Sequence, residues 1–300
     1  MSEKKKKTTI IDGKKLSNEI KEEIKIEVAR MIDKEDKSPH LAAVLVGDDP
    51  ASQTYVKGKE KASKEVGIIS SVYRHKSDIT EKELLQIVNF LNKDDEIDGY
   101  IVQLPLPGHI NENKIIEAID PKKDIDGFHP INLGRMVAGL PAYLPATPQG
   151  IMEMLKRYDI DTEGKHCVVV GRSNIVGTPI SVLMSRKSKP GNATVTLCHS
   201  RTKNLEEITR QADILIAAIG KPLFVTKNMV KDNAVVIDVG IHRIKSENAA
   251  SGYKLVGDVD FEEVSRKCSY ITPVPGGVGR MTIASLLMNT LKAAKKEVYG

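Results

Sequence analysis

The sequence predicts an α/β protein with two domains, each built on a mainly parallel sheet with helices on its faces. Apolar strand-like runs alternate with helix-like segments from end to end, which is typical of this class. The length of 300 residues is too great for one small core and suits two domains of ordinary size. Hydrophobic residues make up 40% of the chain and charged residues 28%, which is the composition of a folded protein.

The first predicted domain comprises residues 1–148 and begins with an amphipathic helix. Apolar side chains recur there every four residues, at Leu16, Ile20, Ile24, Val28 and Ile32. The later elements are a strand at 41–46, a helix at 51–66 with Ser52 as its N-cap, a strand near Ile68, a helix at 83–91 and a strand at 98–104 that stops at two prolines.

The second predicted domain comprises residues 149–279 and opens with a helix at 150–158. Apolar runs predict its strands at 167–170, 194–198, 214–218 and 235–239. Helices that begin near Thr178 and Asn204 fit between the first three strands. A final helix is expected from Thr282 to about Val298. We expect residues 280–300 to return to the first domain, so that a cleft between the domains is framed from both sides.

The composition argues against several kinds of partner. The net charge of +5 comes from 45 basic and 40 acidic residues spread along the chain, and aromatic residues are only 4%, so no nucleic acid is expected. No apolar run approaches the roughly 20 residues that cross a bilayer, and no apolar stretch follows the N-terminal lysines, so we expect neither membrane insertion nor secretion. Cys167, Cys198 and Cys268 lack CxxC spacing, which fits a reducing cytoplasm.

A glycine-bearing turn follows the expected strand at 167–170. Gly171, Arg172 and Ser173 lie between this strand and the helix that begins near Thr178. Such a turn points backbone N–H groups and the positive end of a helix dipole at a phosphate. The segment departs from the GxGxxG fingerprint, and by itself it fits an ordinary strand-to-helix turn equally well.

The end of the next strand favours NADP over NAD. An NAD site would place an acidic residue there for the ribose hydroxyls, but the chain has Ser200 and Arg201. A hydroxyl and a guanidinium would bind a 2′-phosphate, and Arg172 would add a second positive charge. Glycines also end the strands at 214–218 and 235–239, on the edge where ligands lie in open α/β sheets, and Ile241 follows the second of them. These features predict a Rossmann-like dinucleotide-binding domain.

Lys59 departs from the pattern of the other lysines in the helix at 51–66. At about 100° per residue, Lys57, Lys61 and Lys64 share the side expected to face solvent, whereas Lys59 falls on the other side with Tyr55. A lysine on an inward face must snorkel, find a carboxylate or lose its proton. Burial lowers its pKa from about 10.4 and makes it a usable acid–base group. The pattern alone favours snorkelling.

Two later segments strengthen the functional interpretation of Lys59. Gln103, at the end of the strand that stops at two prolines, is placed to hydrogen-bond the amine. Asp124 and Asp126 lie in a tight loop, where carboxylates suit the N–H donors of a heterocycle. Turn chemistry before Gly127 is the alternative, and it is the preferred interpretation for Asp124.

Five segments occur in order and together resemble one enzyme family. They read YVKGK at 55–59, VQLPLP at 102–107, KDIDG at 123–127, GRS at 171–173 and TPVPGGVG at 272–279. Together they resemble the bifunctional methylenetetrahydrofolate dehydrogenase/cyclohydrolase family, and the resemblance runs from about Ile10 to Lys296. It implies a two-domain enzyme, usually a homodimer, with the folate in the cleft between a catalytic domain and an NADP-binding domain.

The resemblance also implies the reaction and the roles of single residues. NADP takes a hydride from 5,10-methylenetetrahydrofolate, and water then opens the methenyl product to 10-formyltetrahydrofolate. No metal is implied. Lys59 would be the general acid/base, Gln103 would tune its protonation, Tyr55 would pack on the folate and Asp126 would hold the pterin. The other expected contacts are Leu104, Pro275, Gly276 and Gly277 for the substrate, and Gly171, Arg172, Ser173, Ser200, Arg201 and Ile241 for NADP.

Arg280 departs from the family pattern, which usually has proline after the Val-Gly of the last segment. Proline is preorganised for the start of a helix. Arg280 loses this property and adds a charge, which leaves the loop geometry and the relative rates of the two steps open. Two alternatives follow: a dehydrogenase with little cyclohydrolase activity, against which Lys59 and Gln103 argue, and a catalytically silent binding protein, which only Arg280 supports.

Overall fold

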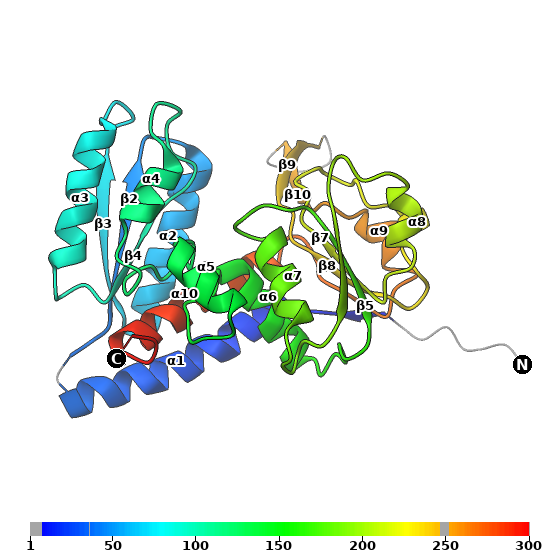
Figure 1. Ribbon diagram of the computed structural model, residues 1–300, viewed down its shortest axis with the longest axis horizontal. Helices are drawn as coiled ribbons and strands as arrows, with labels where there is room; N and C mark the ends of the chain where they lie inside the picture. Colours follow the sequence, from blue (N-terminus) through cyan, green and yellow to red (C-terminus); the bar gives the residue numbers. More distant parts are fainter. Residues whose placement is uncertain (1–7, 36, 247–251, 300) are drawn as a thin grey trace, which may run out of the picture. The chain divides into compact units, whose positions relative to one another are not determined.

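The computed structural model describes residues 8–35, 37–246 and 252–299 and is an α/β protein, as the sequence predicts (Figure 1). Backbone contacts divide it into two compact units. We name the two units after the domains that the sequence predicts: the catalytic unit contains residues 18–146 and 283–299, and the nucleotide unit contains residues 8–17 and 147–282. The lysine run at 4–7 lies outside the described residues. Within the described ranges, no helix has the length and apolar character needed to cross a membrane.

The catalytic unit has a three-stranded parallel sheet in the order β3-β2-β4. Its strands are β2 (His40–Val46), β3 (Ile69–His75) and β4 (Gly99–Val102). The helices of this part of the chain are α1 (Gly13–Glu35), α2 (Pro50–Glu65), α3 (Glu81–Lys93), α4 (Glu112–Ala118) and α5 (Pro130–Val137). The central strand β2 is buried from Leu41 to Val46, as expected for a parallel strand covered on both faces.

One face of this sheet packs against α3 (Figure 1). Alternate residues of β2 and β4, including Val44 and Tyr100, point to this face because strand side chains alternate with a period of two. Leu84, Val88 and Leu91 of α3 meet them at helical spacing. Helix α2 also contacts β2 and β3, and it carries the lysine of the candidate site.

The N-cap of α2 differs from the one that the sequence predicted. Helix α2 begins at Pro50, and the Asp49 carboxylate accepts a hydrogen bond of 2.7 Å from the Ser52 N–H. The expected Ser52 cap is therefore wrong, because Asp49 followed by proline is a complete start signal and leaves Ser52 buried in the first turn. Helices α4 and α5 were not predicted, although Asn111 and His129 cap them.

The buried stripe of α1 follows a period of 3.6 residues rather than four. Leu16, Ile20, Ile24 and Val28 are buried as predicted. Ile32 is exposed instead, and Met31 takes the buried place. Over four turns, the difference between the two periods moves the buried stripe back by about one to two residues.

The nucleotide unit has a six-stranded parallel sheet in the order β1-β11-β8-β7-β5-β6. Its strands are β1 (Thr9–Ile10), β5 (His166–Val170), β6 (Thr194–Cys198), β7 (Ile214–Ala217), β8 (Val235–Asp238) and β11 (Tyr270–Ile271). Its helices are α6 (Ala146–Arg157), α7 (Gly177–Ser185), α8 (Leu205–Thr209), α9 (Phe261–Val264) and the 3-10 turn η1 (Lys227–Met229). The four predicted strands of this half are confirmed. The antiparallel pair β9 (His242–Lys245) and β10 (Tyr253–Val256) was not predicted.

The two ends of the described chain belong to different units. Strand β1 pairs with β11, so residues 8–17 contact the nucleotide unit, whereas the sequence placed them in the first domain. Helix α10 (Val278–Ala294) begins four residues before the predicted start. Its Asn289 Nδ2 donates to the carbonyls of Ile125 at 2.8 Å and Leu144 at 3.0 Å within the catalytic unit. The limits of the two functional domains stay a prediction.

Candidate active site

Lys59 lies on the buried face of α2, with only 8% of its surface exposed. Val56 and Ser63 are buried on the same face, at the three- and four-residue spacing that aligns helical side chains. The three lysines expected to face solvent, Lys57, Lys61 and Lys64, are exposed. The angular argument from the sequence is therefore confirmed for the position of Lys59.

Gln103 is the hydrogen-bond partner of Lys59. The Lys59 Nζ donates to Gln103 Oε1 at 3.2 Å. The other end of the amide is fixed, because Gln103 Nε2 donates to the Leu104 carbonyl at 2.7 Å, and the Gln103 N–H donates to Val44 of β2 at 2.9 Å. These contacts hold the amide so that its oxygen faces the amine. The following Leu104–Pro105 peptide bond is cis.

The charge of Lys59 acts on the carboxyl of Asp126. Burial raises the pKa of its carboxyl, and the positive charge of Lys59 lowers the same pKa in part. An electrostatic effect of this kind requires the two groups to be near each other. The structure thus brings an amine, an amide and a partly exposed carboxyl to one place on the catalytic unit.

Asp124 has a different environment from Asp126, two residues away. It is almost wholly buried, and it accepts hydrogen bonds from the Phe128 N–H at 3.2 Å, the His129 N–H at 2.8 Å and Asn132 Nδ2 at 2.9 Å. Burial raises its pKa to about 7 although these donors oppose the shift. Asp124 closes the turn that presents Asp126, so turn chemistry was the right preference for it.

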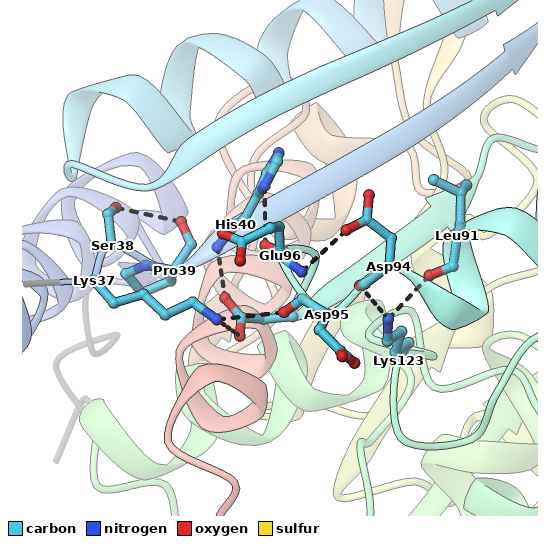
Figure 2. A network of polar contacts seen from close by, with 10 residues as sticks. Lys37, Ser38, Pro39, His40, Leu91, Asp94, Asp95, Glu96 and Lys123 are labelled. Atoms are coloured by element: carbon cyan, nitrogen blue, oxygen red, sulfur yellow. Dashed lines mark hydrogen bonds and ion pairs between the residues drawn. The ribbon is translucent and has the colours of Figure 1, made fainter. Parts of the chain in front are cut away.

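Lys123 anchors the same loop to the end of α3 (Figure 2). Its Nζ donates to the carbonyls of Leu91 at 3.0 Å and Asp94 at 2.6 Å, and its own carbonyl accepts from the Tyr100 N–H at 2.9 Å. Burial lowers the pKa of Lys123, and nearby carboxylates such as Asp94 oppose that shift. Lys123 begins the KDIDG segment, and its sequence pattern predicted no role for it.

Tyr55 lies at the flank of the buried face rather than within it. The side chain is 40% exposed, so its placement on the inward side with Lys59 was only partly right. The four-residue step from Tyr55 to Lys59 turns the helix by about 40° beyond a full turn, which moves Tyr55 toward solvent. A half-exposed ring there remains available to a flat ligand.

The turn after β5 has the backbone geometry of a phosphate cradle. Gly171 has φ +121°, and a Cβ there would lie 2.0 Å from the Ala218 carbonyl oxygen. A Cβ on Gly177, at the start of α7, would lie 1.9 Å from the Gly171 oxygen. Only glycine fits at these two positions, because any side chain would overlap the neighbouring backbone. The N-terminus of α7 therefore packs directly against the turn.

The polar residues predicted for NADP lie on two neighbouring turns. Strand β5 pairs with β6 through Val170 and Cys198, and the Gly171 N–H donates to the Cys198 carbonyl at 2.8 Å. The turns after these strands therefore lie side by side. Their exposed side chains are Arg172, Ser173, Ser200 and Arg201. The Ser173 hydroxyl accepts from the Val176 N–H at 3.2 Å and can still donate its own hydrogen. Two cations and two hydroxyls fit a 2′-phosphate well.

The loop at 272–279 leads directly into α10. The Val274–Pro275 bond is cis, Gly276 has φ +107° and Gly277 is buried. Helix α10 begins at Val278, and the Arg280 N–H donates to the Gly277 carbonyl at 3.2 Å. Arg280 therefore donates a backbone hydrogen bond in the first turn of α10, which a proline at this position could not do. The helix forms without the proline.

No group of three His, Cys, Asp or Glu side chains suited to a metal occurs in the described part of the chain.

Residues 11–126 match the tetrahydrofolate dehydrogenase/cyclohydrolase catalytic domain, and residues 145–298 match the NAD(P)-binding domain of the same family. The chain belongs to the tetrahydrofolate dehydrogenase/cyclohydrolase family.

Relatives of this family match nearly the whole chain. The bifunctional protein FolD of Cytophaga hutchinsonii is 63% identical over 95% of this chain and 98% of its own, and that of Bacteroides thetaiotaomicron is 60% identical over 97% and 99%. The solved FolD of Campylobacter jejuni has a TM-score of 0.90 at 52% identity, covering 97% of this chain and 99% of its own. The FolD of Trypanosoma brucei, solved with NADP and an inhibitor, has a TM-score of 0.91 at 35% identity, covering 98% and 99%.

Membership of the tetrahydrofolate dehydrogenase/cyclohydrolase family confirms the activity predicted from the five motifs. The protein is a bifunctional enzyme that uses NADP. It oxidises 5,10-methylenetetrahydrofolate to the methenyl compound and hydrolyses that to 10-formyltetrahydrofolate.

Proposed function

We propose that Lys59 is the general acid/base of the hydrolytic step. The methenyl substrate is a cation that water attacks readily. A neutral Lys59 amine would accept a proton from that water and, as an ammonium, return it to the ring nitrogen that departs. The hydrogen bond from Lys59 to Gln103 on the buried face of α2 carries this proposal, because it fixes the amine while leaving its lone pair for chemistry.

We infer that Asp126 and Tyr55 hold the folate beside Lys59. The partly exposed carboxyl of Asp126 suits the paired N–H donors of a pterin, and its raised pKa reflects a site that water enters poorly. The half-exposed ring of Tyr55, one helical turn before Lys59, offers a face for stacking. Leu104 completes the proposed substrate contacts together with the loop of Pro275, Gly276 and Gly277. We place this loop beside the nicotinamide.

We propose that NADP binds at the turns after β5 and β6. The glycine cradle at Gly171 fits a pyrophosphate, and Arg172, Ser173, Ser200 and Arg201 fit the 2′-phosphate, with Ile241 as a further contact. NADP supplies the hydride acceptor when it is bound. The chain contributes alignment, since the methylene carbon is already activated by two nitrogens. We propose residues 1–148 as the catalytic domain and 149–279 as the NADP-binding domain.

The first test is a spectroscopic assay with 5,10-methylenetetrahydrofolate and either NADP or NAD. Reduced nicotinamide and methenyl absorbance are followed separately. We expect reduced cofactor to appear without lasting accumulation of the methenyl compound, and a higher kcat/KM with NADP. Accumulation would contradict the roles given to Lys59 and Gln103, and a preference for NAD would contradict those of Ser200 and the arginines.

We also propose a homodimer in a reducing cytoplasm. The family resemblance supports the dimer, and light scattering should then give a mass near twice the 33.0 kDa of the chain. Cys167, Cys198 and Cys268 are free and buried, and burial raises the pKa of each thiol, which suits proteins that need no disulfide. Fractionation of cells that produce the protein tests the compartment.

A further inference from the structure

Two buried carboxylates lie at the carboxyl end of the sheet in the nucleotide unit, and the roles above use neither. Asp238 ends β8 and is 3% exposed, and Asp258 follows β10 and is 0% exposed. Burying two carboxylates is costly unless hydrogen bonds compensate. Their partners show what they hold in place.

Asp258 fixes the loop after β7. Its Oδ2 accepts from the Ile219 N–H at 2.8 Å and the Gly220 N–H at 3.0 Å. Its Oδ1 contacts His242 Nε2 at 2.7 Å. Two consecutive backbone N–H groups of the loop are thus held by one carboxylate, and that carboxylate is held in turn by a half-buried histidine of β9.

Asp238 joins Asp258 to two other loops. Its carboxylate accepts from the N–H groups of Asp258 at 2.9 Å and Val259 at 3.0 Å, and from the Gly240 N–H at 3.1 Å. The Asp238 N–H donates to Thr272 Oγ1 at 2.7 Å, at the start of the loop at 272–279. The negative charge of Asp258 adds to burial in raising the pKa of Asp238 to about 7.

The loop after β7 packs directly on the phosphate cradle. A Cβ on Gly171 would lie 2.0 Å from the Ala218 carbonyl oxygen and 3.3 Å from the Ile219 nitrogen. A Cβ on Gly240 would lie 2.3 Å from Asp258 Oδ1. Any shift of Asp258 is therefore transmitted to the cradle on one side and to the Gly240–Ile241 turn on the other.

We propose that Asp258, held by His242, is a positioning residue for NADP: it sets the loop at Ile219 and Gly220 against the Gly171 turn. This inference rests on the NADP site proposed above. It assigns Asp258 no contact with the reacting atoms. Loosening the network should weaken NADP binding while the hydrolytic step, which needs no hydride acceptor, continues.

The experiment compares His242→Ala with His166→Ala. His166 is the matched control: it lies in the same unit, and its Nε2 is hydrogen-bonded to Thr196 Oγ1 at 2.9 Å, but at the opposite, amino end of β5. Steady-state assays give the KM for NADP and the kcat of oxidation, and hydrolysis of the methenyl substrate is measured without cofactor. We expect His242→Ala to raise the KM for NADP about tenfold, the effect of losing one hydrogen bond to a charged group, with kcat and hydrolysis within about twofold.

Three further variants separate positioning from general stability. His242→Gln keeps a side-chain N–H donor and should restore most of the NADP affinity. Asp258→Asn should raise the same KM, and the double variant His242→Ala/Asp258→Asn should raise it no more than the larger single effect, because both act through one network. The inference is overturned by a KM equal to that of His166→Ala. It is equally overturned if oxidation and hydrolysis fall together with the melting temperature. A wild type that prefers NAD would instead count against the proposed NADP site.

Discussion

Replacing Lys59 with methionine removes the amine while keeping a long side chain on the buried face of α2. Lys59 is almost wholly buried, so methionine fills the same space without exposing the core. General acid–base catalysis contributes about 10²- to 10⁴-fold. We therefore expect the hydrolytic kcat to fall at least about 100-fold, which corresponds to about 2.7 kcal/mol or more of lost transition-state stabilisation.

The same substitution has a second effect, on Asp126. The Lys59 charge lowers the pKa of the Asp126 carboxyl, so its loss raises that pKa further and leaves the carboxyl more protonated. We expect the KM for the folate to rise in both steps, whereas the kcat of hydride transfer should fall less than tenfold because that step needs alignment rather than a proton carrier. Methenyltetrahydrofolate should then accumulate.

The assay follows methenyl absorbance and reduced nicotinamide in one reaction. Lys57→Met is the matched control, since Lys57 is exposed on the opposite side of the same helix. Both variants should retain the wild-type circular dichroism spectrum. A Lys59→Met enzyme that hydrolyses the methenyl substrate as fast as Lys57→Met would refute the assignment of Lys59.

Three other predictions address the cofactor, the C-terminal helix and pH. Ser200→Asp places a carboxylate at the end of β6, where it would repel a 2′-phosphate and accept from ribose hydroxyls. We expect kcat/KM with NADP to fall about 100-fold and the preference to move toward NAD; an unchanged preference would contradict the placement of the 2′-phosphate. Asn289→Ala leaves the buried carbonyl of Ile125 and the partly buried carbonyl of Leu144 without their donor. The free energy of unfolding in urea should fall by about 2 kcal/mol, and a loss below about 0.5 kcal/mol would show that other groups replace the amide. Asp124 and Asp238 have their pKa values raised by burial from 3.8 to about 7. The folded protein thus holds protons that the unfolded chain has released, so the free energy of unfolding should fall as pH rises from about 5 to 7.5. The carboxylates with lowered pKa values, such as Glu81, finish titrating below this window. Urea titrations at pH 5.5 and 7.5 test this, and stability that rises across the range would contradict it.

The sequence predicted the parts of the fold whose signals are local and periodic. The four strands predicted for the nucleotide unit, β5, β6, β7 and β8, lie within one residue of the predicted bounds. The position of Lys59 followed from rotation along a helix, and that of Gln103 from the end of a strand. These inferences need no knowledge of distant parts of the chain, because helical and strand periodicity fix which side chains share a face.

The elements that were missed lack a periodic apolar pattern of their own. Strand β1 is two residues long and becomes a strand only by pairing with β11, which is some 260 residues later. The β9–β10 pair has exposed residues on both strands, so it lacks the apolar alternation of a half-buried hairpin. Helices α4 and α5 are under three turns long, too short for a periodic stripe to stand out.

The sequence revealed the residues expected to face a ligand more readily than the buried residues that fix the loops around them. Asp126 and Arg172 are partly or fully exposed, and their motifs and charges made them visible in the sequence. Asp124, Asp238 and Asp258 are buried, and each accepts hydrogen bonds from backbone N–H groups of a neighbouring loop. An aspartate in a turn looks the same in sequence whether it caps that turn or binds a substrate. The hydrogen-bond partners distinguish the two roles: Asp124, Asp238 and Asp258 accept from backbone N–H groups of loops, whereas Asp126 stays a predicted contact of the folate.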